Sequence, residues 1–309
     1  MISMTQNKEV YHVPVMLEAC LEGLNIHPEG VYVDVTFGGG GHSKAIFSKL
    51  SKKGQLIAFD QDPDALANAW EAPNFHLIPS NFSFLKNHLR AMGIEKVDGI
   101  LADLGVSSHQ FDEGKRGFSI RSNDPLDMRM NQNGALSAFV VVNEYEEEQL
   151  IKILRKYGEL TSPGKIAGTI CRARQANPIH TTGELMEALA PIAPKFKDHK
   201  FFAQVFQAIR MEVNNELDVL ERFLMQTDEV LKPGGRLVVM SYHSLEDRLV
   251  KNYLKRGNLD GHLEKDFFGN ILKPFEDVTR KPISPSEEEI EVNSRARSAK
   301  LRIAERRNG

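Results

Sequence analysis

Short apolar segments that alternate with helical ones constrain the first third of the chain most strongly. Four such segments are rich in β-branched and aromatic residues and have the length of strands. Between them, apolar residues recur at helical spacing, and Pro63 stands where a helix begins. Strands separated by helices form parallel βαβ units, so we expect a doubly wound α/β sheet. The expected strands are 31–37, 55–60, 75–78 and 97–104.

The rest of the chain has two different patterns. Helical segments broken by turn-forming residues fill the stretch 135–204, and no strand pattern occurs there. A long helical stretch, 202–230, is followed by further strands at 236–242 and 298–305, with a loop-rich segment between the two strands. The sequence therefore predicts one α/β domain, made of residues 1–134 and 205–309, and an inserted helical domain, 135–204, that recognises the substrate.

Composition limits the class of protein. The 309 residues are 41% hydrophobic, enough for a sizeable core, and the net charge of −3 argues against a wholly basic nucleic-acid binder. Cys20 and Cys171 form no CxxC pair, so neither a zinc site nor a disulfide scaffold is indicated. Because no signal peptide and no apolar run of about 18 residues is present, we expect a cytoplasmic protein that does not enter a membrane.

A run of glycines follows the first expected strand, in the sequence VDVTFGGGGHS at 33–43. Glycine permits a tight turn and a close approach of a ligand to the backbone, and the next helix offers free N–H groups. The pattern is neither GxGxxG nor a P-loop, which disfavours NAD and ATP. Such a turn by itself is as often purely structural. We interpret Gly38 to His42 as the cradle of a nucleotide-type cofactor.

Aspartates stand at the ends of several expected strands. Asp60 ends the second strand, where a carboxylate can accept both hydroxyls of a ribose. Asp103 ends the fourth strand, and Asp34 could orient the glycine turn or meet an ammonium group. Because ligands bind beyond the carboxyl ends of such strands, these side chains are expected to converge. Strand-end aspartates are also common helix caps, and this is the better interpretation of Asp62.

Several longer blocks, read together, resemble the RsmH family, formerly called MraW. The resemblance runs from about His12 to Glu305. It implies a class I methyltransferase fold with a helical insertion. It also implies transfer of a methyl group to N4 of a specific cytidine in 16S ribosomal RNA, in the decoding region of the bacterial small subunit. The blocks include HVPVMLEA (12–19), DVTFGGGGHS (34–43), DGILADLGVSSHQ (98–110), PLDMRM (125–130), FQAIRMEVNNEL (206–217), SYHSLEDR (241–248) and NSRARSAKLRIAE (293–305).

The resemblance also implies a cofactor, S-adenosylmethionine. On the residues alone, Phe82 is better explained by core packing. The family often has Arg or Lys where Gly39 stands and Gly where Asp124 stands, and neither departure touches an implied contact. The implied contacts fall on Gly40, Gly41, His42, Asp60, Phe82, Asp103 and Gln110.

Methyl transfer to an exocyclic amine needs close alignment of the reacting atoms and an acceptor for the amine protons. Asp103 is our candidate for that acceptor, although it could equally bind only the cofactor. Tyr242 and His243 follow the fifth expected strand on the same rim and are further catalytic candidates. No second ligand has suitable spacing from the histidine, so no metal site is expected.

An RNA substrate adds two requirements. The target base must leave its stack, and Phe111 and Phe118 could receive it, although loop anchoring explains both at least as well. Phosphates require cations, and we expect the loop 115–129, above all Arg116 and Arg129, to contact RNA before the basic tail does. The basic candidates are Lys115, Arg116, Arg121 and Arg129 in the loop, Arg172 and Arg174 in the insertion, and Arg295, Arg297, Lys300 and Arg302 in the tail.

Two other functions compete with this interpretation. A DNA or protein-amide methyltransferase typically has a [DNS]PP[YF] motif after the fourth strand, whereas this chain has DLGVSS, so DNA is not expected as a substrate. A non-catalytic assembly factor should have lost Asp60 or Asp103, and both are present. The sequence leaves open whether the substrate is naked 16S RNA or the small ribosomal subunit, and whether the protein is a homodimer.

Overall fold

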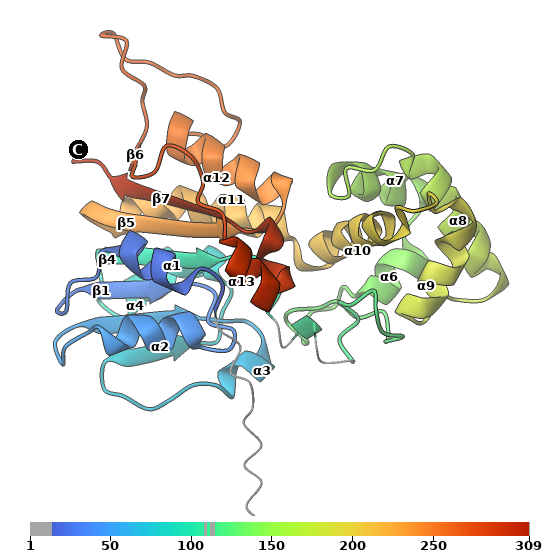
Figure 1. Cartoon of the computed structure of the whole chain (residues 1–309), viewed down its shortest axis with the longest axis horizontal. Coiled ribbons are helices and arrows are strands. Elements are labelled where there is room, and N and C mark those ends of the chain that lie inside the picture. The colour runs from blue at the N-terminus through green and yellow to red at the C-terminus, as the bar shows by residue number, and fades with distance from the viewer. Residues whose placement is uncertain (1–13, 108–109, 112–114, 309) are drawn as a thin grey trace, which may run out of the picture.

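The computed structural model describes residues 14–107, 110–111 and 115–308. Figure 1 shows two lobes, one built on a β-sheet and the other made of helices. Helix α10 (Asp198–Asn214) belongs to the helical lobe and leads into α11 (Glu216–Val230) of the sheet lobe. Within the described ranges, no helix has both the length and the apolar composition needed to cross a bilayer.

Seven strands in the described part of the chain form one sheet, in the order β3-β2-β1-β4-β5-β7-β6. Neighbouring strands from β3 to β5 are parallel, and β7 is antiparallel to β5 and to β6. The expected doubly wound sheet of a class I methyltransferase is confirmed. The strands are β1 (Val31–Asp34), β2 (Gln55–Phe59), β3 (Phe75–Ile78), β4 (Val97–Asp103), β5 (Leu231–Ser241), β6 (Phe275–Asp277) and β7 (Lys300–Arg306).

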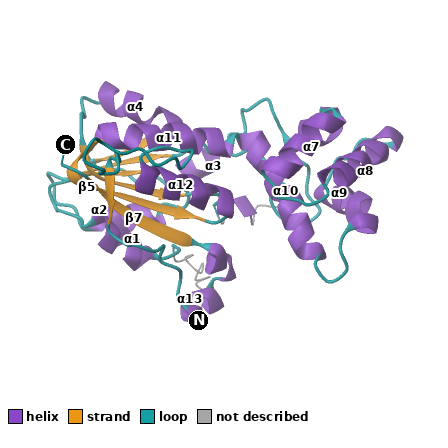
Figure 2. Ribbon diagram, turned by 90° about the horizontal axis from the view of Figure 1, so that it is seen from above, coloured by secondary structure: helices purple, strands orange, loops and turns teal. Residues whose placement is uncertain are grey.

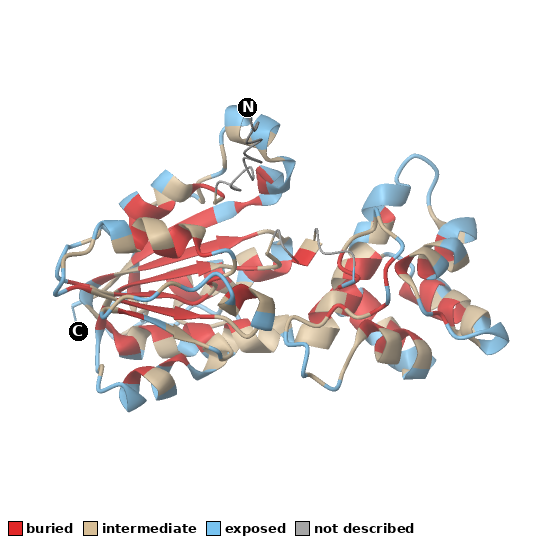
Figure 3. Cartoon of the chain, turned by 90° about the horizontal axis from the view of Figure 1, so that it is seen from below, coloured by how far each residue is buried: buried red, intermediate tan, exposed pale blue. Residues whose placement is uncertain are grey.

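Helices cover both faces of this sheet (Figure 2). Successive strand residues point to opposite faces, so Val33 packs in the cluster with α4, α11 and α12, whereas Tyr32 packs in the cluster with α1 and α2. Both residues are fully buried, and Figure 3 shows most of each central strand buried between the helices. The other elements of this lobe are α1 (Leu17–Leu24), α2 (Gly41–Ser48), α3 (Pro63–Leu66), η1 (Phe82–Phe84), α4 (Leu85–Ala91), α12 (Ser244–Arg256), α13 (Glu287–Val292) and η3 (Ser294–Ser298).

The helical lobe has a hydrophobic core of its own. This core includes Phe118 and Met128 before the expected insertion 135–204 and Ile209 after it. We therefore propose that the inserted unit is wider than the motif pattern suggests and extends from about residue 116 to the end of α10. Its helices before α10 are α6 (Ala138–Glu144), α7 (Glu147–Lys156), α8 (Pro163–Ala176), α9 (Thr182–Leu189) and the short η2 (Ala190–Ile192).

Three details differ from the sequence pattern. The helical stretch 202–230 is two helices, because Asn215 adopts a left-handed conformation with φ of 50°. Strand β5 begins at Leu231, and the turn residues 232–235 bulge out between the pairs Val97–Leu231 and Gly99–Arg236. Strand β6 lies in the segment expected to be loop, since three residues are too few to show an alternating pattern.

Candidate active site

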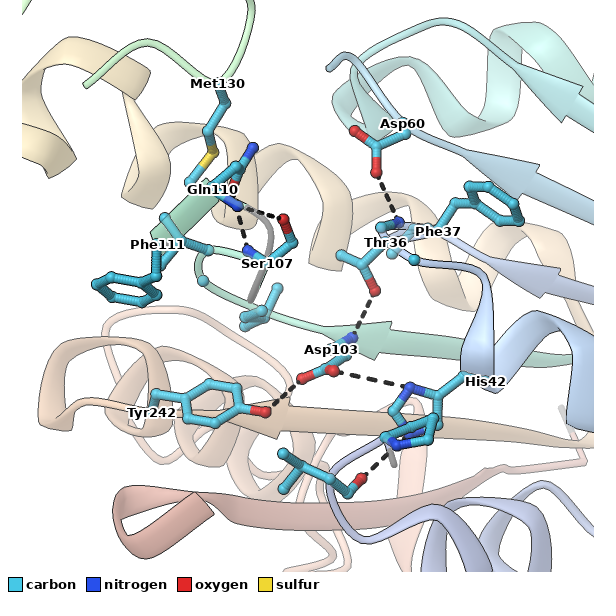
Figure 4. A pocket seen from close by; sticks show the side chains of 18 of the residues that line it. Thr36, Phe37, His42, Asp60, Asp103, Ser107, Gln110, Phe111, Met130 and Tyr242 are labelled. Carbon is cyan, nitrogen blue, oxygen red and sulfur yellow. Dashed lines mark hydrogen bonds and ion pairs between the residues drawn. The ribbon is translucent and has the colours of Figure 1, made fainter. Parts of the chain in front are cut away.

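A cavity of about 600 Å³ opens at the carboxyl ends of the central strands (Figure 4). The strand order reverses between β1 and β4, and open α/β sheets bind ligands at such a point. The cavity brings together most of the residues implied by the family resemblance, from five separate segments. Its lining includes Gly41, His42, Asp60, Phe82, Asp103, Gln110, Tyr242 and His243.

The glycine turn forms one wall of the cavity. Gly38 has φ of 51° and donates its N–H to Asp60 Oδ2 at 2.8 Å. Gly40 is not among the lining residues; it is the N-cap of α2, with φ of 75°, and donates its N–H to the Phe37 carbonyl at 2.7 Å. A Cβ at Gly41 would overlap the Pro14 ring, whereas a Cβ at Gly39 would meet no atom within 4 Å. Gly39 therefore has room for a Cβ atom, unlike Gly41.

Asp60 faces the turn from the end of β2. Its carboxylate accepts N–H groups from Gly38 at 2.8 Å and Asp62 at 2.9 Å. Burial raises the pKa of Asp60 to about 6, an increase that these two N–H donors oppose. A buried carboxylate at a cavity wall is favoured by further hydrogen-bond donors. Asp60 is thus a suitable acceptor for ribose hydroxyls.

Asp34 stabilises the glycine turn through hydrogen bonds to its two flanking segments. Its carboxylate accepts the Ser43 hydroxyl at 2.6 Å and the Thr36 N–H at 3.1 Å, and it is fully buried. These bonds fasten the first turn of α2 to the end of β1. Of the two roles that the sequence left open for Asp34, the geometry supports orientation of the glycine turn.

Asp103 lies between two aromatic side chains at the base of the cavity (Figure 4). The Tyr242 hydroxyl donates to Asp103 Oδ1 at 2.8 Å, and His42 Nδ1 lies 3.7 Å from Oδ2. Burial raises the pKa of Asp103 to about 6, although His42 and the Tyr242 hydroxyl lower it. Burial also raises the pKa of Tyr242, as does the neighbouring Asp103. The Asp103 carboxyl therefore has a pKa well above that of an ordinary aspartate, and 23% of its side chain is exposed.

His42 and Thr36 fix the surroundings of that carboxyl. His42 Nε2 is 3.1 Å from the Val15 carbonyl, which can only accept, so a proton belongs on Nε2. The Thr36 hydroxyl accepts the Asp103 backbone N–H at 2.7 Å. Asp103 is thus held by Thr36 after β1, by His42 of α2 and by Tyr242 after β5, and His42 is itself held by the Val15 carbonyl.

His243 lines the cavity, but its ring is engaged with Glu246. Nδ1 accepts the Glu246 N–H at 3.4 Å as the N-cap of α12, and Nε2 lies 3.1 Å from Glu246 Oε1. Burial by itself raises the pKa of Glu246. His243, the Tyr242 N–H and Arg210 together lower it by more than burial raises it, so the pKa of Glu246 lies below its usual range. This geometry suits a positioning role for His243 at the cavity wall.

Arg210 of α10 completes this wall, and the sequence analysis did not single it out. It lines the cavity and forms a two-bond ion pair with Glu216, at 2.8 and 2.9 Å. Glu216, His243 and Glu246 have ligand atoms within 4.8 Å of one another, a spacing that could hold a metal ion. The Arg210 guanidinium already balances charge there, and the expectation of no metal site stays a prediction.

Gln110 belongs to a buried network beside the cavity. It donates from Nε2 to Asp62 Oδ2 at 2.6 Å and accepts the Ser107 N–H at 3.0 Å. Asp62 also accepts the Asp64 N–H at 3.1 Å as the N-cap of α3, so the expected capping role is confirmed. Gln110 is therefore held against the sheet lobe rather than extended into solvent.

The expectation that Arg116 contacts RNA is wrong. Its side chain is only 6% exposed and forms ion pairs with Asp62 at 2.8 Å and Asp64 at 2.6 Å. It also donates to the carbonyls of Arg129 and Met130, at 2.9 and 3.3 Å. A guanidinium so occupied stabilises the loop and offers no surface to a phosphate.

Other basic candidates also form ion pairs or hydrogen bonds within the protein. Arg129 pairs with Asp127 at 2.6 Å, and Arg174 donates to two carbonyls at the end of α6. Arg302 is buried and pairs with Asp247 at 2.8 Å. Lys300 lies 3.7 Å from the same carboxylate. The basic candidates that are exposed to solvent are Lys115, Arg121, Arg172, Arg295, Arg297 and Lys300.

The two phenylalanines of the loop region have different surroundings. Phe118 is 6% exposed and packs in the core of the helical lobe, which supports the anchoring interpretation. Phe111 lines the cavity, and the Arg295 guanidinium lies 5.3 Å from its ring centroid. Arg295 belongs to η3, so the C-terminal segment reaches the mouth of the cavity.

Some lining residues carried no signal that sequence reasoning could use. Pro14 and Val15 close the cavity from before α1, Gln207 reaches it from α10, and Asn293 and Ser298 reach it from the C-terminal segment. In the sequence, these residues stand only within blocks that carry the family resemblance.

Comparisons with known proteins show the family of this chain. Residues 9–307 match the MraW methylase family. A ribosomal RNA small subunit methyltransferase H from Christiangramia forsetii is 56% identical over 294 residues, covering 95% of this chain and 97% of the relative. A protein of the same name from Bacteroides thetaiotaomicron is 53% identical over 304 residues, covering 98% and 100%. A solved rRNA methylase from Streptococcus thermophilus covers 94% of each chain at 14% identity, with a TM-score of 0.40. The family match and the identities confirm the resemblance: this chain belongs to the MraW methylase family.

Proposed function

We propose that this protein transfers a methyl group from S-adenosylmethionine to the exocyclic N4 amine of a cytidine in 16S ribosomal RNA, in the decoding region. The observation that carries the proposal is the Asp103 carboxyl, held by the Tyr242 hydroxyl at 2.8 Å in a cavity beside the glycine turn. The relatives named above are small-subunit ribosomal RNA methyltransferases by name. We propose the cytoplasm, where ribosomal subunits are assembled, as the place of action.

S-adenosylmethionine is the cofactor, and the residues present fit it. Asp60 offers a buried carboxylate to the ribose hydroxyls, and the turn at Gly38 to Gly41 leaves room for close approach. Phe82 lines the cavity while its ring packs edge-on against Phe223, so it presents an apolar wall. When bound, the cofactor supplies an electrophilic methyl group on a sulfonium.

Asp103 has the properties needed to activate an amine. The lone pair of N4 is delocalised into the cytosine ring, so a hydrogen bond from N4–H to a carboxylate strengthens the nucleophile. As the new N–C bond forms, the bond between the methyl carbon and the sulfonium sulfur would break, and N4 must lose a proton, which Asp103 can accept. A carboxyl whose pKa is about 6 is ionised at pH 7.5 and is basic enough for this transfer.

Tyr242 and His243 act on this reaction in different ways. The Tyr242 hydroxyl donates to Asp103 and sets both the direction and the basicity of the carboxylate. His243 positions the wall through Glu246, whose Oε2 accepts the Tyr242 N–H at 3.0 Å. Tyr242 is thus held at its hydroxyl by Asp103 and at its backbone by the His243–Glu246 pair.

The RNA must deliver an unstacked base to this cavity. Phe111 and Arg295 stand at its mouth, and the helical lobe borders it through Gln207 and Arg210. We propose that this lobe recognises the RNA and that the exposed Lys115 and Arg121 contact phosphates in place of Arg116 and Arg129. A homodimer remains compatible with the sequence.

The experiment compares three substrates with labelled S-adenosylmethionine: small subunits from a strain lacking the enzyme, naked 16S RNA, and DNA of the same sequence. We expect label in ribosomal RNA, and the more efficient of the first two substrates identifies the natural one. The Asp103→Asn variant should bind the RNA but lose at least about a hundredfold in rate, as expected for loss of a general base. Label in DNA alone, or equal rates in the variant, would contradict the proposal.

A further inference from the structure

A second hollow lies on the helical lobe, next to the cavity. This groove has a volume of about 410 Å³. It is formed by three segments: the loop 125–129, the start of α6 and the start of α9. The residues that line it are Pro125, Leu126, Asp127, Arg129, Ser137, Phe139, His180 and Thr181.

The groove and the cavity are separated by a single loop. Arg129 lines the groove, whereas the next residue, Met130, lines the cavity, where Figure 4 shows it beside Gln110. The loop is firmly held, because Asn214 accepts the Met130 N–H at 2.7 Å and donates to the Met128 carbonyl at 2.7 Å. The loop that carries Arg129 and Met130 is therefore a wall that the groove and the cavity share.

The groove presents aromatic faces. The rings of Phe139 and His180 are stacked, with centroids 5.3 Å apart and planes inclined by 29°. Phe139 is partly buried and packs against the core of the lobe, whereas His180 is exposed. Backbone bonds hold the pair in place: the Leu126 N–H donates to the His180 carbonyl at 2.9 Å, and the Phe139 N–H donates to the Leu126 carbonyl at 2.7 Å.

The charged group and the N-cap hydroxyls around the two rings already have hydrogen-bond partners within the protein. Arg129 is paired with Asp127 and also donates to the Gly134 carbonyl at 2.8 Å. The Ser137 and Thr181 hydroxyls accept N–H groups as the N-caps of α6 and α9. The groove therefore has little to offer a phosphate. Its rings suit a planar, uncharged partner, and base stacking on aromatic side chains is a common mode of single-strand RNA recognition.

We propose that this groove is a second base-binding subsite, in which a nucleobase flanking the target cytidine stacks on His180 and Phe139. The inference rests on the proposed function, since it assumes an RNA substrate. The proposed subsite also gives the PLDMRM loop (125–130) a role: the loop separates the RNA base in the cavity from the RNA base in the groove. Because stacking tolerates every base, the subsite contributes affinity and register and little sequence preference.

The test is the steady-state methylation of small subunits from the deficient strain by His180→Ala, with His180→Phe as the rescuing variant. His262, exposed on the far loop of the sheet lobe, provides the matched control as His262→Ala. We expect His180→Ala to raise the KM for subunits roughly five- to tenfold, the lower part of the range for loss of one stacked base. The kcat should stay within about twofold, and His180→Phe should restore the KM.

Two further measurements separate stacking from other roles. Salt dependence of kcat/KM should keep its slope in His180→Ala, because no phosphate contact is lost. Thermal unfolding and the KM for S-adenosylmethionine should match the wild type. An unchanged KM for subunits, a failure of His180→Phe to rescue, or a shallower salt slope would overturn the subsite. A wild-type protein inactive on subunits would overturn the proposed function itself.

Discussion

Replacing Tyr242 by Phe removes one hydroxyl and keeps the ring. That hydroxyl donates to Asp103 Oδ1 at 2.8 Å, and it lowers the pKa of a carboxyl that burial has raised to about 6. Without it the pKa of Asp103 must rise further. A hydrogen bond to an ionised group contributes about 1.5–3 kcal/mol, and the partial exposure of Asp103 favours the lower end. The expected rise is about one pH unit, which corresponds to about 1.4 kcal/mol.

The consequence depends on pH in a defined direction. If methyl transfer needs ionised Asp103, activity falls as the pH drops through its pKa. At pH 6 the ionised fraction falls from about one half to about one tenth, a fivefold loss, when the pKa moves from about 6 to about 7. At pH 8.5 both proteins are almost fully ionised, and their rates should agree within about twofold.

The assay is kcat measured from pH 5.5 to 9 at saturating cofactor and small subunits. Tyr253→Phe is the matched control, because its hydroxyl bonds to Asp228 at 3.1 Å, away from the cavity. The control should retain the wild-type profile. Tyr242→Phe should shift the acidic limb upward by about one unit. A Tyr242→Phe profile parallel to the wild type at every pH would refute the assignment of Asp103 as the ionised group.

Two further predictions concern the walls of the site. Gly41→Ala should destabilise the protein by about 1–3 kcal/mol and weaken cofactor binding, because the new Cβ overlaps the Pro14 ring. Gly39→Ala should change neither property, because a Cβ there meets no atom within 4 Å. Thermal unfolding measures the stability and calorimetric titration measures cofactor binding, and equal effects of the two variants would contradict the turn geometry. Arg116→Gln should cost about 3–5 kcal/mol in urea unfolding, because it removes the ion-pair partner of the buried Asp62 carboxylate. The exposed Arg121→Gln should change stability by less than about 0.5 kcal/mol, and a similarly small loss for Arg116→Gln would refute its structural role.

The sheet and the acidic residues of the site could be predicted because their signals are local. Alternating strand and helix patterns indicated the parallel strands, and carboxyl-end geometry indicated that Asp60 and Asp103 would face one cavity. The break between α10 and α11 depends on the backbone of Asn215, within a pattern that stays helical on both sides. Periodicity alone does not reveal such a break.

The role of Arg116 could not be predicted for a different reason. A cluster of basic residues in a loop predicts a solvated or RNA-binding face, and only the fold shows which members meet carboxylates. The partners of Arg116, Asp62 and Asp64, lie more than fifty residues earlier in the chain. Arg210 was missed in the same way, because its place at the cavity depends on how α10 packs against the sheet lobe.

The central claim concerns one atom, the N4 amine of cytidine. Small subunits from the deficient strain, treated with the protein and S-adenosylmethionine, can be digested to nucleosides and analysed by mass spectrometry. We predict N4-methylcytidine approaching one residue per subunit with the wild type, and almost none with Asp103→Asn. Methylation at carbon 5, on a ribose hydroxyl or on another base would contradict the account.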